Sequence, residues 1–122
     1  MLKNGLGTII NISSQMGHIG SPNRTLYCTT KHAVEGLTKA LAVELAPHGI
    51  RVNAVAPTFI DTPMTKPMFE NTAFKETVEN NIALGHIGKV EDVAAAVMFL
   101  ASSNASMIVG ESLKVDGGWT AW

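Results

Sequence analysis

Two short apolar segments, separated by a long helical one, place the strongest limit on how this chain can fold. Residues 7–12 (GTIINI) and 50–57 (IRVNAVAP) are rich in β-branched and apolar side chains, with almost no alternation between apolar and polar positions. Strands with this pattern are covered on both faces, as in a parallel sheet. Parallel neighbours need a crossover connection, so the intervening residues should form a helix that packs on the sheet.

The ends of that helix are marked by local signals. Ser21 and Pro22 provide an N-cap and a first helical position, and the helix should continue to about His48. His48 suits the negative end of the helix dipole, and Gly49 can adopt the left-handed conformation of a C-terminal cap. We therefore interpret His48 as a structural residue.

The remaining residues continue the alternation of strands and helices. A long, proline-punctuated segment follows Pro57 and contains a short helix near 72–81. The sequence VEDVAAAVMFLASS predicts another helix with an apolar stripe, and SLKVDGG predicts a third strand that ends at a glycine pair. This order predicts an α/β fold in which three parallel strands are joined by crossover helices.

Composition excludes several classes of function. The chain has 122 residues, 46% of them hydrophobic, and a formal net charge of -1, so it has the size of one domain and lacks the basic surplus of a nucleic-acid-binding protein. No apolar run reaches the roughly 18 residues of a membrane span. Cys28 is the only cysteine and is expected to be a small core residue, which agrees with a cytoplasmic location. The four histidines lack metal-ligand spacing, so we expect no metal site.

Tyr27 and Lys31 form the pair with the clearest chemical potential. Residues four apart lie on one helix face, so the phenol and the ammonium can converge beside the sheet. Free tyrosine titrates near pH ~10, and a nearby ammonium favours the phenolate, which suits general acid/base chemistry. Ser14 follows the first strand at its carboxyl end, where open α/β sheets bind ligands. By itself, a Tyr-x-x-x-Lys pair is also typical of an ordinary solvated helix face.

The surrounding motifs favour the chemical interpretation. Ser14 comes 13 residues before Tyr27, and the helix leads into HGIRVNAVAP, which is followed by IDT and, near the end, by VDGG. Together these motifs resemble the carboxyl-terminal half of the classical short-chain dehydrogenase/reductase family, over essentially the whole chain. The resemblance implies one partial domain spanning residues 1–122, the carboxyl-terminal half of a Rossmann-like, doubly wound parallel sheet.

The resemblance implies a role for each residue that matches the family's motifs. Ser14 would anchor the substrate oxygen and Tyr27 would donate or accept the proton. Lys31 would assist the ionisation of Tyr27 and, with it, hold the nicotinamide ribose of NAD or NADP. The substrate would be a small-molecule carbonyl or alcohol.

The loop after the second strand is implied to contact the cofactor. Pro57 would begin this loop, and Ile60 and Thr62 would contact the nicotinamide carboxamide. Thr58 is a departure, since the family usually has glycine there. From residue type alone, four further side chains either line a substrate pocket or fill the core: Met16, Met64, Met68 and Phe69.

Two classes of function remain open from the sequence. None of the chain's glycine pairs has the context of a phosphate-binding loop. In the family this loop and the determinant of NAD or NADP preference lie upstream of the matched segment. The chain therefore belongs to an NAD(P)-dependent oxidoreductase, or it is a truncated and catalytically silent assembly module. We expect little cofactor binding or activity from these residues alone.

The sequence also predicts a homo-oligomer. The helix after Ser14 has small and apolar residues around more of its circumference than one buried face requires, among them Ala33, Gly36 and Ala40. In the family the corresponding helix lies at a dimer interface. The strand at residues 7–12 is expected to be an apolar sheet edge as well, and such edges tend to pair.

Overall fold

The computed structural model describes residues 1–3 and 5–122, and a parallel sheet lies at its centre. The strands are β1 (Gly7–Ile12), β2 (Ile50–Pro57) and β3 (Ser112–Val115), in the order β1-β2-β3. Both pairings are parallel, from Gly7 beside Ile50 and from Ala54 beside Ser112. The predicted α/β fold with three parallel strands and crossover helices is confirmed.

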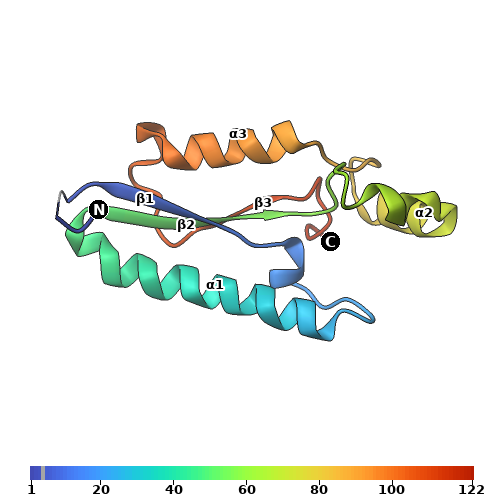
Figure 1. The fold of residues 1–122 in the computed structure, drawn as a ribbon, viewed down its shortest axis with the longest axis horizontal. Helices are drawn as coiled ribbons and strands as arrows, with labels where there is room; N and C mark the ends of the chain where they lie inside the picture. Colours follow the sequence, from blue (N-terminus) through green and yellow to red (C-terminus); the bar gives the residue numbers. More distant parts are fainter. Residues whose placement is uncertain (4) are drawn as a thin grey trace.

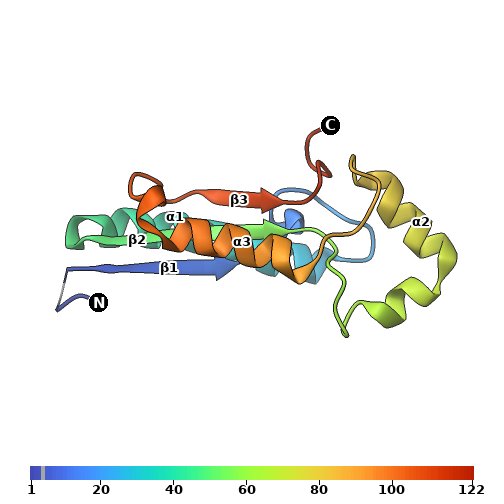
Figure 2. The same ribbon diagram turned by 90° about the horizontal axis from the view of Figure 1, so that it is seen from above.

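Helices cover both faces of this sheet (Figure 1). α1 (Thr25–Leu45) lies on one face and α3 (Val90–Ala101) on the other, while α2 (Thr72–Asn81) extends beyond the carboxyl ends of the strands (Figure 2). Short 3₁₀ helices complete the chain: η1 (Gln15–Gly17), η2 (Ala46–His48), η3 (Lys66–Glu70) and η4 (Ser103–Ala105). The segments that follow β1 and β2 therefore meet at one end of the molecule.

β2 is the centre of the hydrophobic core. Val52 and Val55 are fully buried because β2 has a strand on each side and a helix on each face. Val52 packs with Ala42 of α1, and Val55 packs with Leu100 of α3. Burial on both faces explains why this strand shows no alternation of polar and apolar residues.

α1 begins at Thr25, so the prediction that Ser21 and Pro22 start this helix is wrong. Asn23 adopts a left-handed backbone with φ 59°, which a right-handed helix cannot contain. Arg24 instead donates its backbone N–H to the Ser21 carbonyl at 3.2 Å, closing a turn before the helix. The other end agrees with the prediction, since Gly49 is left-handed with φ 72° after the short η2.

One face of α1 packs on the sheet. Its buried residues are Cys28, Glu35, Thr38 and Ala42. Their spacing of seven, three and four positions places them on one side of the helix. Burial of the free Cys28 thiol agrees with its expected role as a small core residue.

The VDGG sequence after β3 forms a tight turn. The Asp116 carboxylate accepts hydrogen bonds from the backbone N–H groups of Gly118 and Thr120, both at 3.0 Å, and from the Thr120 hydroxyl at 2.7 Å. Gly117 and Gly118 are left-handed, with φ 57° and 88°. A Cβ on Gly117 would lie 2.6 Å from a methyl carbon of Ile82, so both conformation and space require glycine there.

The charge of Asp116 is stabilised by this turn. Burial works to raise the pKa of its carboxyl, but the hydrogen bonds from Thr120 and Gly118 and the nearby Lys114 outweigh burial and hold that pKa below its ordinary value. Because the pKa is lower in the folded than in the unfolded chain, this stabilisation is complete above the unfolded value of about 4. It is lost as the pH falls through the folded value.

We therefore predict that Asp116→Asn lowers the free energy of unfolding by roughly 1–2 kcal/mol at pH 7, because the hydrogen bonds lose their charged acceptor. The difference from the unsubstituted chain should shrink as the pH is lowered toward about 3. Urea denaturation at both pH values measures it. Asp61→Asn, at an exposed carboxylate, is the matched control. An equal loss at both pH values would contradict the assigned role.

Candidate functional site

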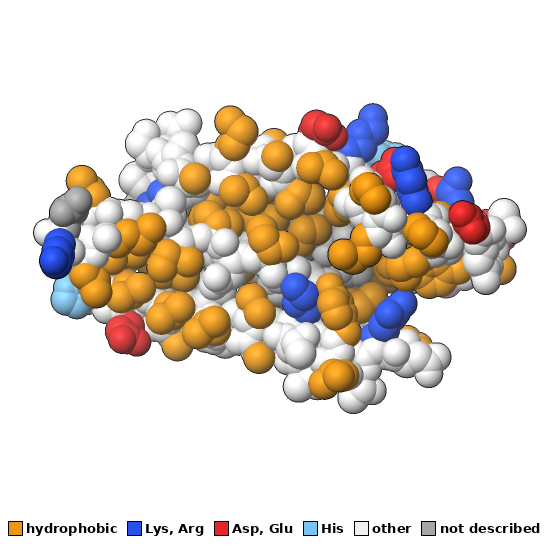
Figure 3. Space-filling view, in the orientation of Figure 1, with side chains coloured by type: hydrophobic (Ala, Val, Ile, Leu, Met, Phe, Trp, Pro, Cys, Tyr) orange, Lys and Arg blue, Asp and Glu red, His pale blue; other side chains and the backbone are white. Residues whose placement is uncertain are grey.

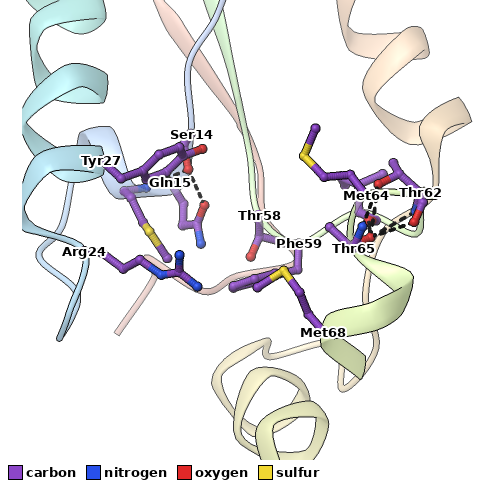
Figure 4. Close-up of a pocket in the computed structure, with 12 residues that line it drawn as sticks. Ser14, Gln15, Arg24, Tyr27, Thr58, Phe59, Thr62, Met64, Thr65 and Met68 are labelled. Atoms are coloured by element: carbon purple, nitrogen blue, oxygen red, sulfur yellow. Dashed lines mark hydrogen bonds between the residues drawn. The ribbon is translucent and has the colours of Figure 1, made fainter. Parts of the chain in front are cut away.

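A cavity of about 280 Å³ lies where the segments after β1 and β2 meet (Figure 4). Ser14 to Met16 approach it from β1, Thr58 to Thr65 from β2, and α1 contributes its first turn. Its wall consists of Ser14, Gln15, Met16, Arg24, Tyr27, Thr58, Phe59, Ile60, Thr62, Met64, Thr65 and Met68. Most of this wall is apolar, with a few polar groups among the apolar side chains, as is usual for small-molecule sites.

Ser14 is held firmly at this cavity. It is 3% exposed, its hydroxyl donates to the Gln15 side-chain oxygen at 2.7 Å, and it accepts from the Met16 backbone N–H at 3.1 Å. A hydroxyl has one proton and two lone pairs, so one lone pair stays available in this arrangement. Rotation of the hydroxyl away from Gln15 would direct its proton to a ligand oxygen.

Tyr27 and Lys31 lie together near the start of α1. The Lys31 ammonium is 5.6 Å from the centre of the Tyr27 ring and donates to the Ile12 carbonyl at 3.0 Å, at the end of β1. That bond uses one of three ammonium protons, so two remain for other partners. Tyr27 itself lines the cavity with Ser14 and is 44% exposed, which leaves its ring accessible to a ligand.

The loop after β2 brings two of its three proposed cofactor residues to the cavity. Ile60 and Thr62 line it, whereas Pro57 is the last residue of β2 and lies outside the lining. Thr62 and Thr65 hold the loop through bonds between the backbone N–H of each and the hydroxyl of the other, at 3.0 and 3.3 Å. The Thr65 hydroxyl also donates to the Ile60 carbonyl.

The four side chains proposed for a substrate pocket divide into two groups. Met16, Met64 and Met68 line the cavity. Phe69 lies outside its lining and joins an aromatic cluster, with its ring centre 6.0 Å from that of Phe59 and 6.1 Å from that of Phe74. Phe59 is the link between the two, because it lines the cavity and packs in the cluster.

Sequence reasoning missed several residues of the cavity wall. Gln15, which accepts the Ser14 proton, follows that serine directly. Arg24 precedes Tyr27 by three positions, the spacing of neighbours on a helix face, and this spacing was the available signal. Thr65 had no such signal, because its role depends on how the loop folds.

The Thr58 hydroxyl offers a direct test of whether a cofactor fits. Its oxygen is buried and has no hydrogen-bond partner among the described residues, although Thr58 lines the cavity. Buried hydroxyls are nearly always paired, so a ligand with a polar group is a natural partner. The Thr58 hydroxyl, and the Lys31 ammonium just outside the lining of this cavity, are polar groups of the kind that a nicotinamide nucleotide can bond.

Known proteins resemble this chain closely. A family model described as "Enoyl-(Acyl carrier protein) reductase" matches residues 1–120. The 3-oxoacyl-[acyl-carrier-protein] reductase of Thermotoga maritima is 47% identical over 118 residues, which cover 97% of this chain and 47% of that protein. The chain belongs to the short-chain dehydrogenase/reductase family. It spans about half the length of the curated relatives it matches.

Solved structures of dehydrogenases share this fold. A gluconate 5-dehydrogenase from Burkholderia cenocepacia J2315, in complex with NADP and tartrate, has a TM-score of 0.95 and 33% identity, over 99% of this chain and 48% of that one. A 4-hydroxyisoleucine dehydrogenase mutant complexed with NADH and succinate has a TM-score of 0.94 and 36% identity, over 98% of this chain and 50% of that one. These two structures contain NADP and NADH, respectively.

The described residues contain neither a helix able to span a membrane nor a group of side chains able to hold a metal ion. Across residues 1–3 and 5–122, none of the helices is long and apolar enough to span a membrane. Within the same residues, His, Cys, Asp and Glu side chains form no group able to hold a metal ion.

A polar cluster of the buried Glu35 and Ser112 with the more exposed His18 lies beside the segment that contains Ser14. Glu35 of α1 accepts a hydrogen bond from the Ser112 hydroxyl of β3 at 3.0 Å, and the His18 ring lies 3.2 Å from the same carboxylate oxygen. His18 also lies 3.1 Å from the Ser112 hydroxyl. The cluster thus joins α1, β3 and the end of η1. None of its three residues lines the cavity.

We predict that Glu35→Leu lowers the free energy of unfolding by roughly 1–3 kcal/mol, because it leaves the buried Ser112 hydroxyl and the His18 ring without their shared acceptor. Glu35→Gln keeps a side-chain oxygen at this position and should cost less. Denaturant unfolding of both variants measures the difference. Equal losses for Leu and Gln would show that the acceptor does not matter.

Proposed function

We propose that this chain provides the catalytic groups of an NAD(P)-dependent oxidoreductase, which moves a hydride between nicotinamide and a carbonyl or secondary alcohol. One observation is central: the Ser14 and Tyr27 hydroxyls line one cavity, and the Lys31 ammonium lies beside the Tyr27 ring. The relatives named above support the same reaction class, since they are reductases and dehydrogenases. The lone, unpaired Cys28 agrees with a reducing compartment, so we propose a cytoplasmic location.

In this proposal the protein's own residues manage the substrate oxygen and its proton. The bound nucleotide supplies or accepts the hydride at carbon. During carbonyl reduction, Tyr27 donates its hydroxyl proton to the substrate oxygen, and the Lys31 ammonium stabilises the phenolate that results. Ser14 turns its proton from Gln15 to the same oxygen and so holds the carbonyl beside the phenol. Alcohol oxidation reverses each step.

Different residues around the cavity are proposed to contact different parts of the cofactor. We assign the nicotinamide ribose to Lys31, through the two protons that Ile12 does not use, and to the Tyr27 hydroxyl. Ile60 and Thr62 would border the nicotinamide carboxamide. Thr58 lines the same cavity, its hydroxyl has no partner among the described residues, and it replaces the glycine usual in the family, so we include it among the groups that contact the ring.

A fusion chain makes the reaction testable. Residues 1–122 match only about half of the Thermotoga maritima reductase. In this fusion the unmatched amino-terminal part of that reductase therefore precedes residue 1. We expect the fusion to oxidise NADPH or NADH with a ketone substrate, and the 122-residue chain alone to show little activity. Failure of the folded fusion to turn over any ketone with either nucleotide would overturn the proposal.

Tyr27→Phe in the fusion should lower kcat by roughly 10²- to 10⁴-fold, the usual contribution of a positioned acid or base. Only a hydroxyl is removed from a 44% exposed side chain, so the fold should be unaffected. Steady-state kinetics and circular dichroism check the two expectations. Thr30→Val, which removes an exposed hydroxyl from the same helix, is the matched control. An unchanged kcat in Tyr27→Phe would remove this residue from the mechanism.

A second candidate function is assembly without catalysis, and the surface of α1 favours it. Opposite its buried face, this helix exposes Ala33, Gly36, Leu37 and Ala40 to solvent. β1 is an edge strand, and its Ile12 is 52% exposed. On the face of the molecule where β1 lies nearest the viewer, hydrophobic side chains gather over the middle (Figure 3). Small exposed residues allow close helix packing, and an open edge favours strand pairing. We propose a homo-oligomer with either function.

Sedimentation velocity at micromolar concentration tests this assembly. We expect a dimer or larger species, and Ala40→Glu should weaken it by at least about tenfold, because the carboxylate would be desolvated in a helix contact. Lys39→Glu, at the neighbouring exposed position, is the control for added negative charge. A stable monomer contradicts the proposal, and an unaffected oligomer in Ala40→Glu moves the contact to the edge of β1. Ketone reduction by the fusion, and its loss in Tyr27→Phe, would separate an enzyme from a silent module.

A further inference from the structure

Arg24 introduces an unpaired positive charge into the wall of the cavity. Its guanidinium makes no hydrogen bond or ion pair with any residue that the structure describes; only its backbone is bonded, to Ser21 and Cys28. Figure 4 shows the side chain extending across the cavity toward Thr58 and Phe59. Arg24 is exposed to solvent as a whole residue, and it also lines the space that Ser14 and Tyr27 line.

The surroundings of Arg24 contain nothing to neutralise it. None of the residues lining the cavity, all of them described, is acidic, and the first turn of α1 has no acidic residue. The apolar part of the wall includes the side chains of Met16, Phe59, Ile60, Met64 and Met68. A ligand that fills such a space strips water from the guanidinium, which costs free energy unless the ligand provides a charged partner.

The position of Arg24 relative to Tyr27 sets where that partner would lie. Arg24 is the residue before α1, Tyr27 lies in the first turn of α1, and both line the same cavity. One small molecule can therefore reach the Tyr27 hydroxyl with its reacting oxygen and the guanidinium with a group a few bonds away. Arginine binds a carboxylate through two parallel N–H···O bonds, a geometry that lysine lacks.

Arg24 is also accessible from a second direction. It lines a neighbouring cavity of about 520 Å³ together with Met16, Phe59 and residues of α2. The guanidinium thus stands between two spaces, and the rest of a substrate can occupy either one. This arrangement would allow Arg24 to bind one end group of a substrate while the remainder of that substrate varies.

We propose that Arg24 binds a carboxylate of the substrate, so that the preferred substrates are oxo acids and the corresponding hydroxy acids. This inference rests on the proposed oxidoreductase function and adds the class of substrate. Reduction of a neutral ketone of the same shape would leave the guanidinium desolvated and unpaired. Arg24 is thereby a specificity-determining residue, distinct in role from Ser14, Tyr27 and Lys31.

The test compares acids with their methyl esters in the fusion described above. The substrates are 2-, 3- and 4-oxopentanoate and the three esters. We expect kcat/KM for the best acid to exceed that for its ester by about 10- to 100-fold, the range for a hydrogen bond to a charged group. Arg24→Gln should bring this ratio close to one, and Arg24→Lys should restore part of it. Lys39→Gln, an exposed cation outside this cavity, should keep the ratio.

The outcomes separate this inference from the proposed function. If neutral ketones are reduced but acid and ester perform equally, and Arg24→Gln changes neither, the inference is overturned and the oxidoreductase proposal stands. If no ketone is reduced, the oxidoreductase proposal fails, and binding to the 122-residue chain decides the inference. In that case an NMR titration with 4-oxopentanoate should shift the Arg24 side-chain signal, and Arg24→Gln should weaken binding at least about tenfold. Absence of both effects would overturn it.

Discussion

The parallel pairing of β1 with β2 is the constraint on which the rest of this structure depends. Ile12 lies beside Val55, and one residue later the backbone N–H of Ser13 donates to the Val55 carbonyl at 2.8 Å. Because parallel strands end at the same edge of a sheet, this register brings the segment with Ser14 next to the segment with Thr58. A slip of this pairing by one residue would move Ser14 relative to Thr58 along this edge of the sheet.

α1 is bound to the sheet by polar contacts at several depths as well as by its apolar face. Near its start, Lys31 donates to the end of β1, and one turn later Glu35 joins His18 and Ser112. Further along, the Thr38 hydroxyl accepts from the Asn11 amide at 2.9 Å. Each of these bonds fixes the position of the helix along the direction of the strands. Apolar packing changes less when the helix shifts along that direction. The position of Tyr27 relative to Ser14 follows from these bonds.

The loop after β2 is supported differently, through aromatic packing. Phe59 contacts Phe69, Phe74 and Trp119, with ring centres about 6 Å apart, and so connects the cavity to η3, α2 and the chain end. The turn at Asp116 holds Trp119 through its neighbours, since Thr120 bonds to that carboxylate. The VDGG turn therefore supports the cavity indirectly, because it holds Trp119, which packs against Phe59 in the cavity wall.

Local sequence patterns were sufficient for the elements and for part of the candidate site. The apolar runs at 7–12 and 50–57 predicted the buried strands, and the i, i+4 spacing predicted that Tyr27 and Lys31 share a helix face. These features depend on residues that are close in the chain, where backbone geometry alone determines which side chains are neighbours. The start of α1 was missed because the left-handed Asn23 has no strong sequence signal.

Tertiary structure alone decided the contacts between distant segments. Glu35 and Ser112 are 77 positions apart, so no periodicity relates them. The same holds for the placement of Phe69 in the aromatic cluster and of Arg24 opposite Thr58, which depend on how α1, η3 and the loop after β2 pack together. Sequence thus determined which chemical groups are present and which of them share an element. The packing of elements determined which groups face one cavity, because that depends on the relative positions of whole helices and strands.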